Sequence, residues 1–563
     1  MNPDEPTHFN CLIAGTGLIE SILAAALSKA GYSVLQLDPA PYYGTEHASL
    51  SLSELAQWAA TTPGAEASAP APPEQLMKQS QRFALSLCPM LLRAKGEAID
   101  LLVRSKVAAY LQFGLLGGVG LFRPGKDGKD GEGTVERVPA SKADVFNDTT
   151  LSLVEKRRLT KLLLFAAGQE PLEQDKEIVE DPDIPFVDYL KKAYSLSGPA
   201  AESLAYALAL CSSPSDPALP ALARIRHTIH SIGRYGPSPY LVGHYGGAGD
   251  LVGGFSRICA VWGGGQILGR PAGALEREPE VGRKVPTAQA PFVQHERKPP
   301  APAAPEAAVG EKEGQQQTRP LGIPVELEPG EEPTMFTGDW VISSPHLLPT
   351  LFPSSSSSSS SAPTSAHLIA ILPSPVAFPP PRAPADAEAG AAEEDDPDSK
   401  MFVFPPRALR DECGTVTALQ VGKGTMSCPE GYHVLYLSAP LLSAPSPCPS
   451  AADLLAPYLS ALLALPSASP SSSSTPVVPL YTTTYLSSPP PPPPASLPPN
   501  MLVTPYLPSR AEQYTAATTT DALDELVPLV EKTFWSVVGE AGRAEGVEFF
   551  RREERDEGED EEQ

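Results

Sequence analysis

Residues 9 to 20 read Phe9-Asn10-Cys11-Leu12-Ile13-Ala14-Gly15-Thr16-Gly17-Leu18-Ile19-Glu20, an apolar strand that runs through a glycine turn into a helix. A second strand pattern, over residues 33–38, follows and ends in Asp38. This order of strand, glycine turn, helix and acid-ended strand is typical of a dinucleotide-binding βαβ unit. The sequence therefore predicts an α/β fold with a Rossmann-like domain.

The dinucleotide fingerprint is degenerate, because Gly15 and Gly17 are present while Glu20 stands at the third glycine position. That position favours a residue without a side chain, so that the helix packs closely on the strand, and the helix N-terminus beside it favours an anionic pyrophosphate. A carboxylate adds bulk and like charge there. We therefore expect a core of dinucleotide-binding shape that holds no cofactor.

Composition narrows the class of protein. The chain has 563 residues and 66 prolines, which indicates a folded core much shorter than the chain. Its 42 basic and 67 acidic side chains give a net charge of −25, which argues against nucleic-acid binding. Seven scattered cysteines without a CxxC pair indicate reduced thiols. With no basic leader and no apolar run long enough to span a bilayer, we expect a cytosolic protein.

The periodicity predicts a discontinuous first domain interrupted by a helical second domain. Strand patterns recur late in the chain, at 340–343, 368–372, 401–404, 416–421, 433–437, 481–485 and 501–504, before a helix over 521–538. The expected segments are the N-terminal βαβ part (1–75), the helical domain (76–232), a return to domain I (233–274), a disordered insertion (275–334), the remaining strands and last helix with low-complexity insertions (335–540), and an acidic tail (541–563).

Low-complexity runs lie between these strands, namely Ser354–Ser361, the acidic stretch Ala383–Lys400 and Pro489–Pro494. They offer little apolar surface to offset chain entropy. Surface loops tolerate such insertions, because closure entropy grows slowly with loop length. Proline runs also serve as ligands for proline-reading modules, and both interpretations stay open.

A second glycine cluster runs from Tyr235 to Gly265, and its centre is Tyr245 to Arg257. We expect Asp250 to cap a helix from Leu251 to Trp262 and Gly263 to supply its left-handed end. Arg257 lies two turns beyond Asp250 on the same face, so the two form either an exposed ion pair or half of a protein-binding surface.

Nothing in the sequence demands catalysis. No G-x-S-x-G elbow accompanies the glycine cluster, and no Ser/His/Asp or Cys/His set is visible. His227 and His230 are an i, i+3 pair without further ligands, so we expect no metal site.

The motifs together closely resemble the superfamily of Rab GDP-dissociation inhibitors and Rab escort proteins. The resemblance rests on Gly15 to Ser21, Pro41 to Gly44, Tyr235 to Tyr240, Gly253 to Arg257 and Val261 to Gly264. Arg137 to Asn147, Leu153 to Arg157 and Gly424 to Cys428 are similar to the escort branch. The resemblance implies the fold of flavin-dependent oxidases without a bound flavin.

The resemblance also implies roles for residues whose motifs match. Tyr43, Asp250 and Arg257 fall on the Rab-binding platform, although the family usually has Glu where this chain has Asp250, and Tyr240 matches a position near the groove for the Rab C-terminal tail. Phe146 and Arg157 match the pair through which escort proteins engage Rab geranylgeranyltransferase.

An escort protein is not an enzyme. As accessory component A it binds GDP-bound Rab GTPases, presents them to the α/β transferase, holds the geranylgeranyl groups, and delivers the prenylated Rab to membranes during vesicular transport. Two geranylgeranyl chains must be shielded from water, since burying each methylene group stabilises the complex by about 0.8 kcal/mol. Candidate walls of a prenyl cleft are Leu101, Leu102, Leu162, Leu163 and Phe165. The alternatives are a Rab GDP-dissociation inhibitor, which the residues around Phe146 disfavour, and an FAD-dependent oxidoreductase, which Glu20 opposes.

Overall fold

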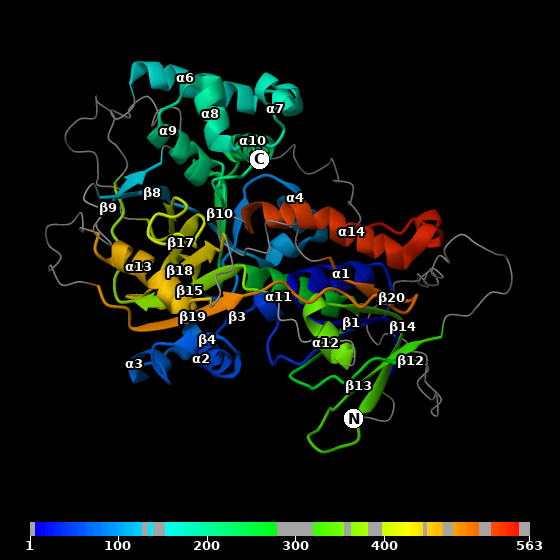
Figure 1. The fold of residues 1–563 in the computed structure, drawn as a ribbon. Helices are drawn as coiled ribbons and strands as arrows, with labels where there is room; N and C mark the ends of the chain where they lie inside the picture. Colours follow the sequence, from blue (N-terminus) through cyan, green and yellow to red (C-terminus); the bar gives the residue numbers. More distant parts are fainter. Residues whose placement is uncertain are drawn as a thin grey trace, which may run out of the picture.

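The computed structural model describes residues 6–125, 133–138, 152–277, 319–353, 362–380, 397–442, 448–465, 477–505 and 519–550. Two large sheets lie beside each other, and a group of helices stands at one end of the second sheet (Figure 1). Among the described residues no helix is both long and apolar enough to cross a membrane.

The first sheet is the predicted Rossmann-like sheet. Its parallel strands run in the order β11, β2, β1 and β14, with β20 on the far side of β14. They span His8–Ala14 (β1), Val34–Asp38 (β2), Gly265–Leu268 (β11), Thr334–Ser343 (β14) and Met501–Val503 (β20). Three helices pack on one face: α1 (Leu18–Lys29), α11 (Ala248–Val261) and α14 (Thr519–Ala544). The α/β fold class is therefore confirmed.

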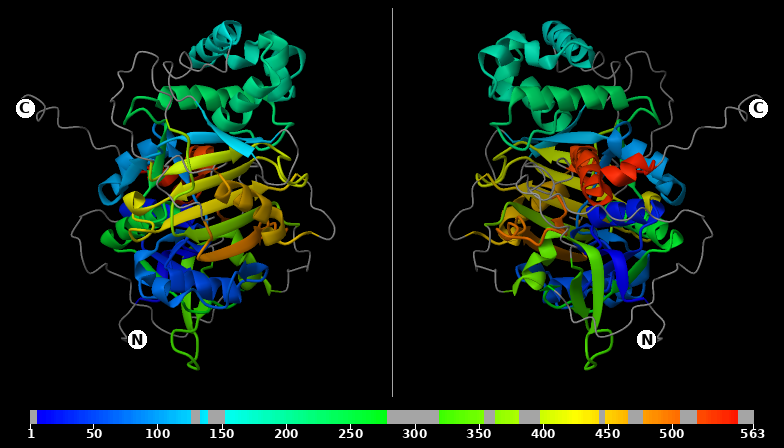
Figure 2. Two further views of the ribbon diagram at one scale, coloured as in Figure 1. Left: turned by 90° about the vertical axis from the view of Figure 1, so that its left-hand side faces the viewer. Right: turned by 90° about the vertical axis from the view of Figure 1, so that its right-hand side faces the viewer.

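The second sheet collects strands from distant parts of the chain (Figure 2). Its order is β4 (Ala65–Ala67), β19 (Tyr481–Ser487), β15 (Ser365–Leu372), β18 (His433–Pro440), β17 (Val416–Val421), β16 (Lys400–Phe404), β8 (Val119–Pro124) and β9 (Gly133–Arg137). Every residue of β15, β16 and β17 is buried, because α13 (Ala451–Leu463) covers part of one face and the helical unit lies nearby. The late strands predicted from sequence are confirmed.

The helical unit is shorter than the 76–232 expected from sequence. Its helices are α6 (Leu153–Ala167), α7 (Lys176–Glu180), α8 (Phe186–Tyr194), α9 (Gly198–Glu202), the π-helical segment Ser203–Leu208 and α10 (Ala218–Ser231). Upstream of it lie β5 (Leu85–Ser86), β6 (Leu91–Arg93), α4 (Glu97–Ser105), the short helix η3 (Val107–Tyr110) and β7 (Phe113–Leu115), followed by β8 and β9. Short apolar runs do not distinguish strand from buried helix, and apart from the β8–β9 hairpin these strands pair with partners more distant in the chain.

Strand pairs tie this region to the sheets. β6, β10 (Tyr240–Gly243) and β7 form a small antiparallel sheet. Before them, η1 (Thr45–His47), β3 (Ser49–Leu50), α2 (Leu52–Thr61) and α3 (Glu74–Met77) complete the N-terminal part. The side chain of Arg93 is buried and its Nε donates to Asp521 Oδ1 at 2.8 Å, while its Nη1 donates to the Arg224 carbonyl at 3.0 Å. This guanidinium joins α10 to the start of α14.

The segment 275–334 is not wholly without structure, which corrects the expectation for its end. β12 (Glu276–Arg277) pairs with β13 (Leu321–Val325), and β13 pairs antiparallel with β14. Leu321, Ile323 and Val325 are buried in the core beside the first sheet. Their alternate apolar spacing lies at the edge of a proline-rich stretch, so composition concealed the strand. Residues 278–318 lie outside the described residues.

Candidate protein-binding site

The glycine turn after β1 is closed by the chain itself. Gly15 has φ +113°, and the Thr16 N–H and hydroxyl both donate to Asp38 Oδ2, at 2.9 and 2.7 Å. Asp38 Oδ1 accepts the Ala40 N–H at 2.9 Å. In a dinucleotide fold the acid at this position binds ribose. Here both carboxylate oxygens are engaged by the chain's own loops.

Glu20 lies over the glycine turn at the start of α1. Its side chain is 2 % exposed and folds back over Gly17, where a Cβ atom would clash with Glu20 Oε2. Thr504 Oγ1 donates to Glu20 Oε1 at 2.5 Å. Burial, together with the nearby Glu46 carboxylate, raises the pKa of Glu20. The residues present therefore do not fit a flavin dinucleotide.

The exposed face of α11 forms the centre of a candidate protein-binding platform. The helix begins at Ala248 with Gly247 as its N-cap, so Asp250 lies in the first turn and does not cap the helix as expected. Three successive residues with positive φ, Tyr245 to Gly247, turn the chain early and start the helix sooner. Gly263, with φ +86°, ends it as predicted.

Asp250 is a half-buried carboxylate at the N-terminus of this helix. Burial alone raises its pKa to about 6, and no ion pair within the described part of the chain joins it to Arg257. The helix dipole favours its charged form. Of the two interpretations raised by the sequence, the exposed ion pair is therefore wrong.

Arg257 contacts an aromatic ring. Its guanidinium lies 4.4 Å from the ring centroid of Tyr110, which ends η3. Such a cation–π contact contributes about 0.5 to 1 kcal/mol at an exposed position and orients the guanidinium. Gly253, between Asp250 and Arg257 on the same face, is exposed, and a Cβ atom added to it would meet no atom of the described residues within 4 Å. Asp250, Gly253 and Arg257 therefore form an open strip on α11, in which an acidic and an oriented basic side chain are separated by a residue without a side chain.

Tyr43 lies on the loop after β2 and is braced against the same helix. Its ring is exposed, and its hydroxyl donates to Gln266 Oε1 at 3.1 Å. Gln266 Nε2 in turn donates to the Ser256 carbonyl of α11 at 3.1 Å. The hydrogen bonds therefore link the loop, the edge strand β11 and α11. Sequence reasoning missed Gln266, because an edge-strand glutamine carries no local signal.

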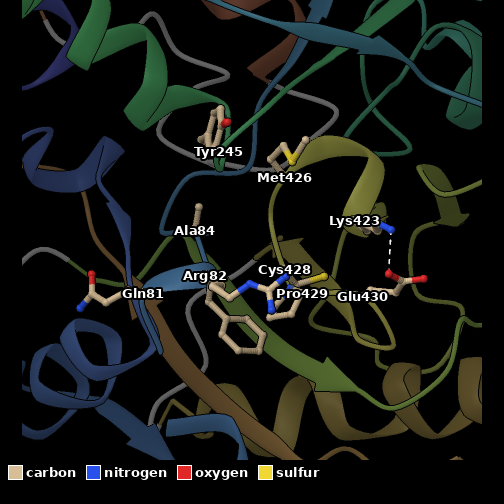
Figure 3. Close-up of a pocket in the computed structure, with 10 residues that line it drawn as sticks. Gln81, Arg82, Ala84, Tyr245, Lys423, Met426, Cys428, Pro429 and Glu430 are labelled. Atoms are coloured by element: carbon tan, nitrogen blue, oxygen red, sulfur yellow. Dashed lines mark hydrogen bonds and ion pairs between the residues drawn. The ribbon is translucent and has the colours of Figure 1, made fainter. Parts of the chain in front are cut away.

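A hollow lies between residues 81–84, the turn that starts α11, and residues 423–430 (Figure 3). It has a volume of about 260 Å³ and is lined by Gln81, Arg82, Phe83, Ala84, Tyr245, Lys423, Met426, Cys428, Pro429 and Glu430. Tyr245 and Met426, both exposed and both with positive φ, stand at one end, and the Tyr245 N–H donates to the Thr425 carbonyl at 3.0 Å. Lys423 and Glu430 form an ion pair of 2.8 Å at another edge. An apolar side chain with a polar neighbour suits this hollow.

Tyr240 lies inside the protein. It is 3 % exposed in β10, and its hydroxyl is 3.5 Å from Thr228 Oγ1 of α10. A partner cannot touch this ring without rearrangement, so the structure offers no direct contact for it. Five residues later, Tyr245 is the exposed aromatic residue of this region.

Of the two residues predicted to contact the transferase, the structure describes only Arg157. Phe146 lies outside the described residues. Arg157 is exposed on α6, in line with exposed Leu153, Lys161 and Leu164 at helical spacing. The neighbouring Arg158 instead donates to the Ser195 carbonyl at 2.7 Å.

The candidate walls of a prenyl cleft do not lie together. Leu101 and Leu102 pack in the core between α4, α11 and α14. Leu162 is buried in a different core, with Leu163 and Phe165 packed against it. Only the α6 residues therefore belong to the helical unit.

We examined the described residues for clusters of metal-binding side chains and for reactive cysteine thiols. No cluster of three or more His, Cys, Asp or Glu side chains there is arranged to hold a metal ion. All seven cysteines are free thiols, and burial raises the pKa of Cys88, for example, to about 12.

The family model described as GDP dissociation inhibitor matches residues 4–285. The chain is 32 % identical over 289 residues to Rab proteins geranylgeranyltransferase component A of Drosophila melanogaster, covering 48 % of this chain and 54 % of that protein. It is 31 % identical over 269 residues to Rab GDP dissociation inhibitor beta of Canis lupus familiaris, covering 47 % and 56 %. These matches span about half the length of the curated relatives. The crystal structure of Rab GDI from Plasmodium falciparum shares the fold, with a TM-score of 0.59 and 20 % identity over 93 % of this chain and 98 % of that one.

Proposed function

The chain belongs to the GDP dissociation inhibitor family, and on that premise we propose that it is a Rab escort protein. In this role it binds GDP-bound Rab GTPases, presents them to Rab geranylgeranyltransferase, and carries the prenylated product to membranes. It works by binding alone, in the cytosol and in transient contact with membranes. The observation that carries the proposal is the open α11 strip with its oriented arginine beside a partly apolar hollow.

Rab binding is assigned to the platform of Tyr43, Asp250 and Arg257. Arginine and tyrosine are the residues that most often anchor interfaces, and the bracing by Tyr110 and Gln266 lowers the entropy lost when a partner docks. An arginine held by a ring presents its free N–H groups to carboxylates or carbonyls of the partner.

The Tyr245–Met426 hollow is the proposed place for an apolar side chain from the Rab C-terminal tail. It replaces Tyr240 in that role, because Tyr240 is buried. The hollow and the platform are joined by the turn that starts α11, so one partner can contact both.

Transferase binding is assigned to the exposed face of α6. A helix that leaves Leu153 (84 % exposed) and Leu164 (61 % exposed) in water on the same face as Arg157 has an uncovered apolar strip around a cation. The escort branch is favoured by this face and by the similarity to a protein named as a transferase component.

The second candidate, a Rab GDP-dissociation inhibitor, is favoured by the similarity to proteins of that name.

Reconstituted prenylation separates the two candidates. A Rab, the α/β transferase and geranylgeranyl diphosphate are incubated with and without the chain. An escort makes transfer depend on the chain, whereas an inhibitor binds GDP-loaded Rab and leaves transfer unstimulated. Arg157→Ala, with Arg158→Ala as the matched control on the next residue, links any stimulation to the exposed face of α6.

A further inference from the structure

The connection between β19 and β20 carries six consecutive prolines, Pro489–Pro494. Proline fixes φ near −65° and removes the backbone donor, so a run of this length adopts the polyproline II helix rather than helix or strand. At about 3.1 Å per residue the run extends over about 19 Å. No residue from Ser487 to Asn500 carries a charge.

The residues that flank the run on either side, Ser487 and Asn500, are hydrogen-bonded to the folded protein. The Thr364 N–H donates to the Ser487 carbonyl at 2.8 Å at the end of β19. At the other end the Met501 N–H donates to the Pro498 carbonyl at 3.0 Å, and Asn500 Nδ2 donates to the Asp339 carbonyl at 2.8 Å. The run therefore crosses from the second sheet to the first between two anchors (Figure 1).

The middle of the run is exposed to solvent. Pro491, Pro492 and Pro493 are exposed, whereas Pro490 and Pro494 are half-buried. A polyproline II helix has three residues per turn, so three consecutive exposed residues present all three of its edges to solvent. A groove of another protein has room to close around this turn.

We propose that Pro489–Pro494 is a docking ligand for a protein module whose groove is lined by aromatic side chains. Such grooves bind the preformed polyproline II helix by stacking against proline rings. Some proline-binding domains also require a basic residue beside the prolines, and none lies between Ser487 and Asn500. The proposed partner therefore recognises the shape of the polyproline II helix and contacts its proline rings. The fixed ends lower the ordering cost of binding.

This inference does not depend on the proposed escort function, since the run lies on neither the α11 platform nor the exposed face of α6. A spacer that merely joined two sheets would need length and stiffness but no partner. The two interpretations differ in a direct binding measurement.

The test titrates the full chain with three purified probes, a WW domain, an EVH1 domain and an SH3 domain, by isothermal calorimetry. The chain is expected to bind the WW or EVH1 probe, and the triple variant Pro491→Ala/Pro492→Ala/Pro493→Ala is expected to weaken that binding by about tenfold or more. The control Pro379→Ala/Pro380→Ala, which alters two of three consecutive prolines elsewhere in the chain, should leave the affinity within about twofold.

A second measurement covers the case in which the triple variant unfolds. A peptide of residues 487–500, added in excess, should displace the bound probe from the unaltered chain. The proposal is overturned if the unaltered chain binds neither the WW nor the EVH1 probe at about 1 mM. It is also overturned if only the SH3 probe binds, if a folded triple variant binds as well as the unaltered chain, or if the peptide fails to compete.

Discussion

Glu20→Gln is expected to stabilise the folded chain at neutral pH. Burial and the nearby Glu46 carboxylate raise the pKa of Glu20 to about 8, from an ordinary value of 4.5. Between these two values the folded chain binds a proton at this position that the unfolded chain does not. Stability from this group is therefore complete below pH 4.5 and is lost as the pH rises toward 8.

The magnitude follows from the width of that interval. Each pH unit between the unfolded and folded pKa values removes about 1.4 kcal/mol, so the three units up to pH 7.5 cost at most about 4 kcal/mol. Local relaxation reduces the loss, and we expect the variant to gain about 1 to 3 kcal/mol at pH 7.5 and almost nothing at pH 4.5. Glutamine keeps an oxygen that accepts the Thr504 hydroxyl.

Urea unfolding followed by tryptophan fluorescence at pH 4.5 and 7.5 measures the difference. Glu74→Gln is the matched control, because Glu74 is exposed and pairs with Lys78 in the next helical turn; it should change stability by less than about 0.5 kcal/mol. The reasoning is refuted if the Glu20→Gln variant is less stable than the unaltered chain at pH 7.5. It is also refuted if the variant loses as much unfolding free energy between pH 4.5 and pH 7.5 as the unaltered chain does.

Four further outcomes are expected. Arg257→Ala should weaken binding of GDP-loaded Rab by about thirtyfold, or about 2 kcal/mol, with an unchanged melt, because the side chain is exposed. Because burial raises the pKa of Asp250 to about 6, Rab affinity should fall as the pH drops from 7.5 to 5.5, and Asp250→Asn should bind more weakly with a flatter pH profile. Phe146→Ala should abolish capture of the transferase in a pull-down and leave Rab affinity within about twofold; loss of both partners with a lowered melt would mark a core residue. Deleting residues 278–318 should preserve a single cooperative melt, whereas a deletion that continues through β13 should lower it, since that strand pairs with β14.

The sequence predicted the elements whose signals are local. The glycine turn, the acid-ended second strand and the buried late strands all carry their pattern within a few residues. The strands between residues 85 and 137 do not. β8 pairs with β16 across Val119 and Met401 and with β9 across Gly120 and Arg137, and strands of five or six residues are too short for their apolar pattern to be told from that of a helix.

The candidate site divides in the same way. The common face of Asp250 and Arg257 follows from helical spacing and was predictable. The contact of Arg257 with Tyr110 depends on packing between η3 and α11, and the exposure of Tyr245 depends on a positive φ that non-glycine residues rarely adopt. Burial of Tyr240 was likewise invisible, since an aromatic residue at a strand start suits both a core and a surface.

The glycine turn before α1 and the exposed face of α11 differ in what their side chains contact. In a dinucleotide fold, the helix N-terminus after β1 is kept open for an anion. Here Glu20 and Asp38 close that end with hydrogen bonds to Thr504 and Thr16, so the helix dipole of α1 faces protein atoms. In α11 the first turn carries Asp250, and the next turns lead to Arg257 at the surface. The side chains of Asp250 and Arg257 on α11 are therefore accessible to a partner protein, as the proposed Rab-binding function requires.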